Sequence, residues 1–235
     1  MTDAPKRFYK SAISAELESG WTVTLDGRGV KTPARNNLLL PTQALADIIA
    51  EEWAGQDAVL DIAGMHLTRL ANVAIDRTPV TRAALCDEVV RYCETDLLCH
   101  LAEGSSELRE AEEVRWSPVR AWAGQALGVV LIPVEGISPA QQPPASLEAA
   151  RRYAEAMDDY RLTGLAFGCG VFGSALLAMA VEHGHLSAAD AFAASRVDED
   201  FQSQQWGEDS DAAEAAAARL LEAYALGAWF EALSR

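Results

Sequence analysis

The amino-acid sequence predicts an α+β fold, with a small N-terminal domain that contains a β-hairpin and a larger helical domain after it. Polar and apolar side chains alternate over residues 21–25, as they do along a half-buried strand. The Asp26-Gly27 pair that follows is a strong hairpin signal, because glycine tolerates the positive φ of a tight turn. From residue 42 onward, apolar residues recur mainly at helical spacing.

The N-terminal domain is expected to hold further strands before its first helix. One strand is expected within residues 8–17, and a short one over 38–40 that Pro41 ends. Thr42 has the side chain and the position of a helix N-cap. The apolar positions after it predict an amphipathic helix over 42–56.

The boundary between the two domains is placed where one helix stops and another begins. A second helix is expected over residues 67–77, and Pro79 restarts the chain as a helix. We therefore assign residues 1–78 to the N-terminal α+β domain and residues 79–235 to the helical bundle.

Helices are expected through almost all of the second domain. Ser117-Pro118 is interpreted as an N-cap followed by proline at the first helical position, so one helix should end near Arg115 and another should begin there. Later helices are expected over 147–157, 158–181, 187–205 and 209–233, with breaks at His183-Gly184-His185 and Trp206-Gly207.

Length and charge narrow the functional classes. The chain has 235 residues, half of them hydrophobic, which is enough to bury a substantial core. It carries 19 Lys and Arg against 35 Asp and Glu, for a net charge of −16. So acidic a surface repels phosphate backbones and anionic lipid, and we expect no nucleic-acid partner.

The cysteines and the N-terminus indicate a reducing, cytoplasmic location. Four cysteines occur, none in a C-x-x-C pair and none near a histidine at zinc spacing, so we expect buried thiols rather than a disulfide or metal framework. The first ten residues show no signal or transit peptide.

Residues 162–181 pose the question of membrane insertion. They are uncharged, nearly long enough to cross a bilayer, and contain the helix-packing pattern Gly164-x-x-x-Gly168. The segment is only mildly hydrophobic, however, and its flanks show no clear Lys/Arg bias. We expect a buried central helix and no stable membrane insertion, with a single-pass membrane protein as the alternative.

Two further patterns bear on cofactors and metals. Gly168 to Gly173 matches the dinucleotide pattern G-x-G-x-x-G, but a helix rather than a strand precedes it, so these glycines are expected to allow close helix packing. His183 and His185 flank a turn without further ligands at metal spacing. We expect neither a cofactor nor a metal.

Acidic residues cluster around Trp206-Gly207. They could be a catalytic pair with separated pKa values, acids that favour helix N-termini, or a polar docking surface with Trp206 as its anchor. No serine or cysteine nucleophile stands beside a histidine and an acid, and we expect no catalytic residues. The candidate partner-binding residues are Asp198, Glu199, Trp206, Gly207, Glu208, Asp209 and Asp211.

Arg69, Asn72 and Asp76 fall on one side of the helix expected over residues 67–77. Such a polar stripe could lock the two domains together by hydrogen bonds, or could receive a partner. We favour the lock, and assign these three residues and Trp53 an interdomain or structural role.

Several segments, taken in order, resemble one protein family. They are Asp26-Gly-Arg-Gly-Val-Lys-Thr-Pro33, Leu40-Pro-Thr42, Glu52-Trp53, Leu67-Thr-Arg-Leu-Ala-Asn72, Ala74-Ile-Asp76, Thr95-Asp-Leu-Leu-Cys99, Gln142-Pro143, Gly173-Ser174, Asp198-Glu199, Phe201-Gln202 and Trp206-Gly207. Together they resemble the ATP synthase assembly chaperones that bind the alpha subunit of the catalytic head. The chain departs from that pattern at Ser117, where the family has an aspartate, and at His100, where it has a tyrosine.

The resemblance implies a fold and a function. It implies an α+β domain followed by an orthogonal helical bundle, no catalysis, and one partner, the unassembled alpha subunit. The chaperone would cover the surface of alpha that later meets the beta subunit, since an exposed apolar interface is an aggregation hazard. The alternatives are a small-molecule enzyme that uses the acids near Trp206, and the single-pass membrane protein.

Overall fold

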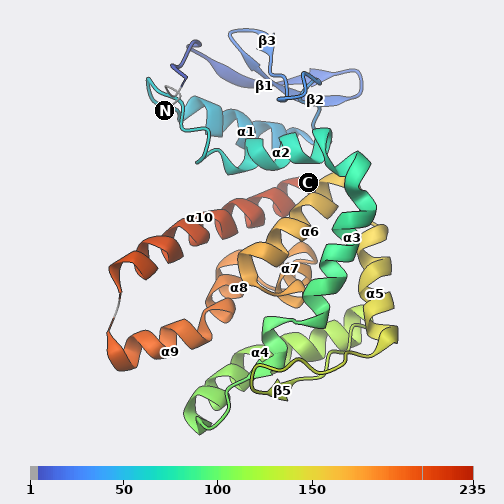
Figure 1. The fold of residues 1–235 in the computed structure, drawn as a ribbon. Helices are drawn as coiled ribbons and strands as arrows, with labels where there is room; N and C mark the ends of the chain where they lie inside the picture. Colours follow the sequence, from blue (N-terminus) through green and yellow to red (C-terminus); the bar gives the residue numbers. More distant parts are fainter. Residues whose placement is uncertain (1–4, 208, 235) are drawn as a thin grey trace.

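The computed structural model describes residues 5–207 and 209–234, and its first layer is a small antiparallel sheet (Figure 1). Strands β1 (Ala12–Leu17), β2 (Gly20–Leu25) and β3 (Arg28–Gly29) lie side by side in that order. Asp26 and Gly27 connect β2 to β3 with positive φ angles of 48° and 81°. This confirms the predicted hairpin turn.

Two predicted strands are shorter in the structure than expected. The strand expected within residues 8–17 forms only over Ala12–Leu17. Residues 38–40 form no regular strand, and Leu40 pairs singly with Trp21 through backbone hydrogen bonds of 2.9 and 2.7 Å.

Two helices form a second layer between the sheet and the bundle (Figure 1). Helix α1 (Gln43–Ala54) packs on the sheet, and α2 (His66–Asp76) packs on the bundle. The Oγ1 atom of Thr42 accepts a hydrogen bond of 3.2 Å from the backbone N–H of Leu45, which confirms Thr42 as the N-cap of α1.

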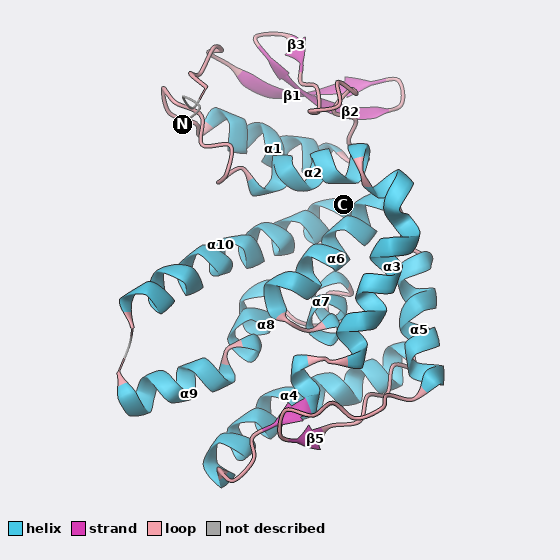
Figure 2. Ribbon diagram, viewed as in Figure 1, coloured by secondary structure: helices cyan, strands magenta, loops and turns pink. Residues whose placement is uncertain are grey.

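The remaining helices build the bundle, which makes the fold α+β as predicted (Figure 2). A short parallel pair, β4 (His100–Leu101) and β5 (Val134–Glu135), lies beside α4 after the one-turn helix η1 (Leu97–Cys99). The bundle helices are α3 (Thr78–Glu94), α4 (Ser106–Leu127), α5 (Pro144–Glu155), α6 (Asp159–Phe172), α7 (Ala175–Glu182), α8 (Ala188–Ser195), α9 (Val197–Trp206) and α10 (Ser210–Leu233).

The buried segment at the centre of the bundle is two helices, so the prediction of one helix over 158–181 is wrong. Gly173 ends α6 in the left-handed conformation, with φ of 64°. Ser174 then caps α7, and its hydroxyl accepts from the N–H of Leu177 at 3.1 Å. The Gly-Ser pair is therefore a helix stop followed by a helix start.

Glycines in α6 allow α10 and α7 to approach closely, as expected. A Cβ atom at Gly168 would lie 2.9 Å from Leu226 Cδ2 of α10 and 3.1 Å from Ala178 Cβ of α7. A Cβ at Gly164 would lie 2.8 Å from the ring of Phe230. Within residues 5–207 and 209–234, no helix has both the length and the apolar character needed to cross a bilayer.

Helix α4 continues through the position where a helix start was predicted, so the interpretation of Ser117-Pro118 is wrong. The helix begins instead after Ser105, whose hydroxyl accepts from the N–H of Leu108, and Pro118 lies in its interior. Proline there leaves the carbonyl of Val114 without its helical N–H partner. Val114 is exposed, so water can reach that carbonyl and lower the cost.

The helix expected over residues 187–205 is also two helices. The chain turns at Arg196, between α8 and α9, with φ of −117° and ψ of 15°. Neither glycine nor proline marks this turn, so no local signal predicts it. Three acidic residues follow in the first turn of α9, where the helix dipole favours negative charge.

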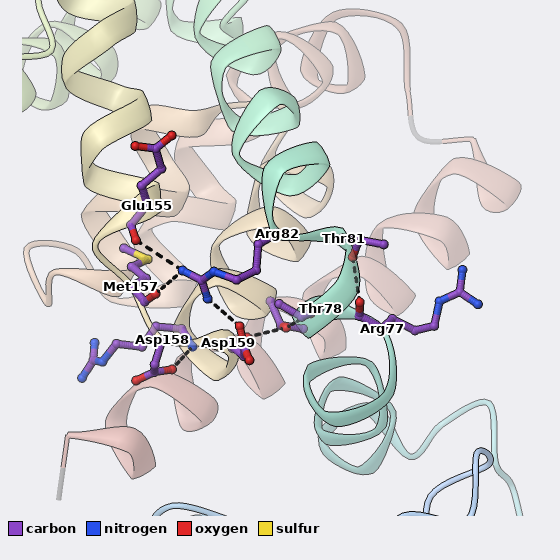
Figure 3. A network of polar contacts seen from close by, with 10 residues as sticks. Arg77, Thr78, Thr81, Arg82, Glu155, Met157, Asp158 and Asp159 are labelled. Carbon is purple, nitrogen blue, oxygen red and sulfur yellow. Dashed lines mark hydrogen bonds and ion pairs between the residues drawn. The ribbon is translucent and has the colours of Figure 1, made fainter.

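A polar network fixes the start of α3 to the junction of α5 and α6 (Figure 3). Arg82 donates a hydrogen bond of 2.6 Å to the carbonyl of Met157 and forms an ion pair with Asp159. Nearby, the hydroxyls of Thr78 and Thr163 share a buried hydrogen bond of 2.6 Å. The domain boundary placed at residues 78 and 79 falls at this network, and it stays a prediction.

Candidate partner-binding site

The segment of the bundle that carries the acidic cluster is largely exposed. We call residues 197–207 and 209–222 the arm; they comprise α9 and the first half of α10, and project away from the bundle (left in Figure 1). No residue of α9 is buried, and the buried residues of α10 begin only at Ala223. The arm is therefore a surface that folding of the chain leaves open.

A cleft between α9 and α10 brings together four of the predicted partner-binding residues. Its volume is about 410 Å³, and its lining includes Glu199, Trp206, Gly207 and Asp209. The side chain of Trp206 is 76% exposed. Gly207 ends α9 with φ of 91°, a conformation that favours glycine.

The other predicted residues lie outside this cleft or serve a second purpose. Asp209 caps α10, because its Oδ1 atom accepts from the N–H groups of Asp211 and Ala212 at 2.9 and 3.1 Å. Asp211 is exposed in the first turn of α10, and Asp198 faces α4. Glu208 lies outside the described residues. Helix capping and an exposed acidic surface thus coexist here.

The charge and shape of the arm suit a docking surface. Residues 197–222 contain eight Asp and Glu residues and a single basic residue, Arg219. Trp206 stands exposed among them, and Leu221 is 60% exposed on α10. An exposed aromatic anchor beside like charges is the arrangement expected of a surface that binds a complementary basic and apolar partner.

A carboxyl pair at the base of the arm was not anticipated from the sequence. Glu112 of α4 is almost fully buried, accepts a hydrogen bond of 2.7 Å from the N–H of Ala102, and meets Asp198 of α9. Burial raises the pKa of Glu112 to about 7, and the nearby Asp198 adds to the rise, whereas Ala102 and the charge of Arg109 act against it. A proton on Glu112 would therefore join α4 to α9.

We expect the Glu112→Gln variant to be more stable than the wild type at pH 8 and equally stable at pH 5. The pKa of Glu112 is higher in the folded chain than its usual 4.5, so the stability that depends on its proton is complete below about pH 4.5 and is lost as the pH rises through 7. The neutral amide keeps the contacts to Ala102 and Asp198 at every pH. The gain at pH 8 should be about 2 kcal/mol, measured by urea denaturation at both pH values. An equal gain in stability at pH 5 and pH 8 would contradict a proton held between Glu112 and Asp198.

The residues predicted to lock the domains make contacts within the N-terminal part. Asp76 accepts hydrogen bonds from Thr32, Asn36 and the N–H of Ala34 at 2.7, 2.8 and 3.0 Å. Burial acts to raise the pKa of Asp76, but these hydrogen bonds outweigh it and lower the pKa. Asp76 thus holds the loop after β3 against α2.

The other candidates for the lock are also placed. Arg69 donates to the carbonyl of Ala63 at 2.8 Å, and the Oδ1 atom of Asn72 is buried without a hydrogen-bond partner among the described residues. The ring of Trp53 packs edge-on against Tyr9, whose hydroxyl donates to the Trp53 carbonyl at 2.7 Å.

Hydrogen bonds that join the sheet layer to the bundle come from residues the sequence did not single out for this role. The hydroxyl of Thr42 donates to the carbonyl of Ala232 in α10 at 2.8 Å. The hydroxyl of Tyr160 in α6 donates to the carbonyl of Leu39. Both link positions more than 100 residues apart, which no local pattern could reveal.

The three consecutive acids at the start of α9 point in different directions. Glu199 lines the cleft between α9 and α10, whereas Asp198 faces α4 and Asp200 lies 3.6 Å from Arg196. Over residues 5–207 and 209–234, no group of three or more His, Cys, Asp or Glu side chains is placed to hold a metal ion. His183 and His185 lie on an exposed turn, and His185 stacks on Trp122 at 4.5 Å.

Two solved structures of bacterial proteins share this fold. The crystal structure of Atp12 from Paracoccus denitrificans is 36% identical, has a TM-score of 0.90, and covers 98% of both chains. A protein from Agrobacterium tumefaciens, solved as a candidate chaperone, is 36% identical with a TM-score of 0.92, over 97% of this chain and 86% of its own. The similarity in fold and sequence therefore places this protein in the class of chaperones.

The sequence comparisons identify the family within that class. Residues 6–124 match the ATP12 chaperone protein family. The mitochondrial protein atp12 of Schizosaccharomyces pombe is 23% identical over 221 residues, which are 89% of this chain and 76% of the relative. The chain belongs to the ATP12 chaperone family, and this confirms the resemblance to ATP synthase assembly chaperones.

Proposed function

We propose that this protein binds the unassembled alpha subunit of the ATP synthase catalytic head and shields the surface that later faces the beta subunit. The observation that carries the proposal is the arm, whose helix α9 buries no residue and which presents Trp206 beside a cleft of about 410 Å³. A surface that contributes so little to the chain's own core is available to a partner. Release would follow when the beta subunit competes for the same surface of alpha.

The chaperone acts by binding alone in this proposal, in the cytoplasm. All four cysteines are free and buried, which fits a reducing compartment. Co-expression of alpha with and without this chain tests the proposal directly: alpha should stay in the supernatant only when the chaperone is present. Alpha that is equally soluble alone, or that is not recovered with this chain, would overturn it.

The Trp206→Ala variant is expected to lose affinity for alpha without losing stability. A central exposed tryptophan contributes about 2 kcal/mol or more to binding, which corresponds to a loss of about 30-fold in affinity. The side chain is 76% exposed, so the melting temperature should not move. Affinity is measured by titration calorimetry with purified alpha.

Ile137→Ala is the matched control for Trp206→Ala. Ile137 is 95% exposed, lies in the segment between β5 and α5, and does not line the cleft between α9 and α10. This variant should bind alpha with wild-type affinity. If both variants lose the same affinity for alpha, neither Trp206 nor the cleft it lines is part of the binding site.

A further inference from the structure

A second groove lies on the other side of α9, between α9 and α4. Its volume is about 510 Å³. Helix α4 lines it with Glu107, Glu110, Ala111, Val114 and Arg115, α9 lines it with Val197, Asp200, Phe201 and Gln204, and Ala193 of α8 closes it. Each helix contributes one face, at the i, i+3, i+4 and i+7 positions.

The two grooves that border α9 use different faces of the helix. The cleft toward α10 uses residues at 199, 202, 203 and 206, whereas the groove toward α4 uses 197, 200, 201 and 204. Both faces of α9 are therefore open. The buried Glu112 of α4 and the half-buried Asp198 of α9 meet next to the second groove.

Part of the lining of the α4–α9 groove is apolar. Val114 is 68% exposed, although it stands midway along a helix whose neighbour Trp116 is fully buried. Val197 and Phe201 are half-buried and face it from α9. Apolar side chains in a concave surface leave favourable burial for a partner to complete.

Another part of the lining is acidic. Glu107 and Glu110 make no ion pair with any residue in the described part of the chain, and Asp200 has only the 3.6 Å contact with Arg196. Arg115 is the one cation among the lining residues. A partner that fits would carry positive charge beside its apolar side chains.

We propose that the α4–α9 groove receives an amphipathic helix of the client, with bulky apolar side chains on one face and Lys or Arg on its flanks. The eight-residue span of the wall from Glu107 to Val114 matches about two helical turns, and helix-in-groove recognition uses the same i, i+3, i+4 and i+7 spacing. A second copy of this chain or an anionic membrane is a poor occupant, because a net charge of −16 repels both. The inference rests on the proposed chaperone function and adds to it a second surface and the chemistry of the segment bound.

The test uses the full chain, purified alpha subunit, and two synthetic 14-residue amphipathic peptides that differ only in having Lys or Glu on the polar face. The Lys peptide should bind and the Glu peptide should not, as followed by fluorescence anisotropy. Glu107→Lys combined with Glu110→Lys should weaken both the Lys peptide and alpha by about tenfold or more.

Two matched variants separate a specific groove from general attraction to an acidic protein. Glu16→Lys combined with Glu18→Lys changes the net charge equally, at exposed positions around the β1–β2 turn, and should bind normally. Val114→Asp should weaken binding, whereas Val80→Asp should not, because it introduces the same charge at an exposed position of α3 that does not line the groove. Both valines are exposed, so folding is preserved in each variant.

The outcomes distinguish this inference from the proposed function. If the groove variants bind the Lys peptide and alpha as well as the wild type does, the groove inference fails while the chaperone function stands. If the Glu16 and Glu18 variant loses as much affinity as the groove variant, the attraction is unspecific and the inference again fails. If the wild type does not bind alpha at all, the proposed function itself fails.

Discussion

The Trp116→Ala variant is expected to lose about 3 to 5 kcal/mol of its free energy of unfolding, as full truncation of a buried tryptophan does. Trp116 lies in α4 and is fully buried, and its Nε1–H donates a hydrogen bond of 2.7 Å to the carbonyl of Ala194 in α8. Its loss leaves a cavity between these helices and an unpaired carbonyl. Urea denaturation at 25 °C measures the change.

Two companion variants sharpen that measurement. Trp116→Phe keeps most of the volume and removes only the hydrogen bond, so it should cost about 1 to 2 kcal/mol. Trp206→Ala removes the same atoms from an exposed site and should cost less than about 0.5 kcal/mol. A larger loss of stability in Trp206→Ala than in Trp116→Ala would contradict the burial of Trp116 and the exposure of Trp206.

The Asp96→Ala variant is expected to lose about 3 kcal/mol at pH 5, because three donors lose their acceptor and each unpaired buried donor costs about 1 kcal/mol or more. Asp96 is fully buried and accepts hydrogen bonds from the hydroxyl of Ser174 at 2.7 Å and from the N–H groups of Leu98 and Leu176 at 3.1 Å each. It therefore holds η1 to the first turn of α7, next to the break between α6 and α7. Thermal and urea unfolding measure the loss.

The loss at Asp96 should depend on pH. Burial raises the pKa of Asp96 from 3.8 to about 6, against the effect of its hydrogen bonds. A group whose pKa is raised by folding contributes stability that is present below about pH 4 and is lost as the pH rises through 6. The difference between wild type and Asp96→Ala should therefore narrow from pH 5 to pH 8. Asp158→Ala, which removes an exposed cap, should cost about 1 kcal/mol at both pH values.

Features that depend on neighbours along the chain could be predicted from the sequence. The Asp26-Gly27 turn and the Thr42 cap were both anticipated, because each needs only a few consecutive residues to form. Close packing at Gly168 was anticipated for a related reason, since a helix that is apolar on all sides must be covered by others.

Features that depend on residues far apart in the chain could not be predicted from the sequence. Proline at 118 normally breaks a helix, but the surrounding packing and the exposed Val114 allow α4 to continue. The turn at Arg196 has no marker in the sequence. Glu112 looks like an ordinary surface residue of a helix, and only the fold brings Asp198 to it across 86 positions of the chain.

The part of the candidate site that is formed by residues close together in the chain could be predicted from the sequence. Trp206, Gly207 and Asp209 are consecutive or nearly so, and their closeness follows from the end of one helix and the start of the next. Glu199 joins them because it is on the same face of α9 as Trp206, two turns away. The groove toward α4 could not be foreseen, since it requires the position of a helix that begins 91 residues before α9.

Helix α9 buries none of its residues, and this has a consequence for how its sequence can change over evolutionary time. Apart from Val197, which packs against the core, and Asp198, which meets Glu112, its side chains can be exchanged with little effect on the stability of the chain. A restriction on the amino acids found at the other positions must then come from contacts with other molecules. The amino acids that related sequences tolerate at each position of this helix would therefore reveal which of its faces a client contacts.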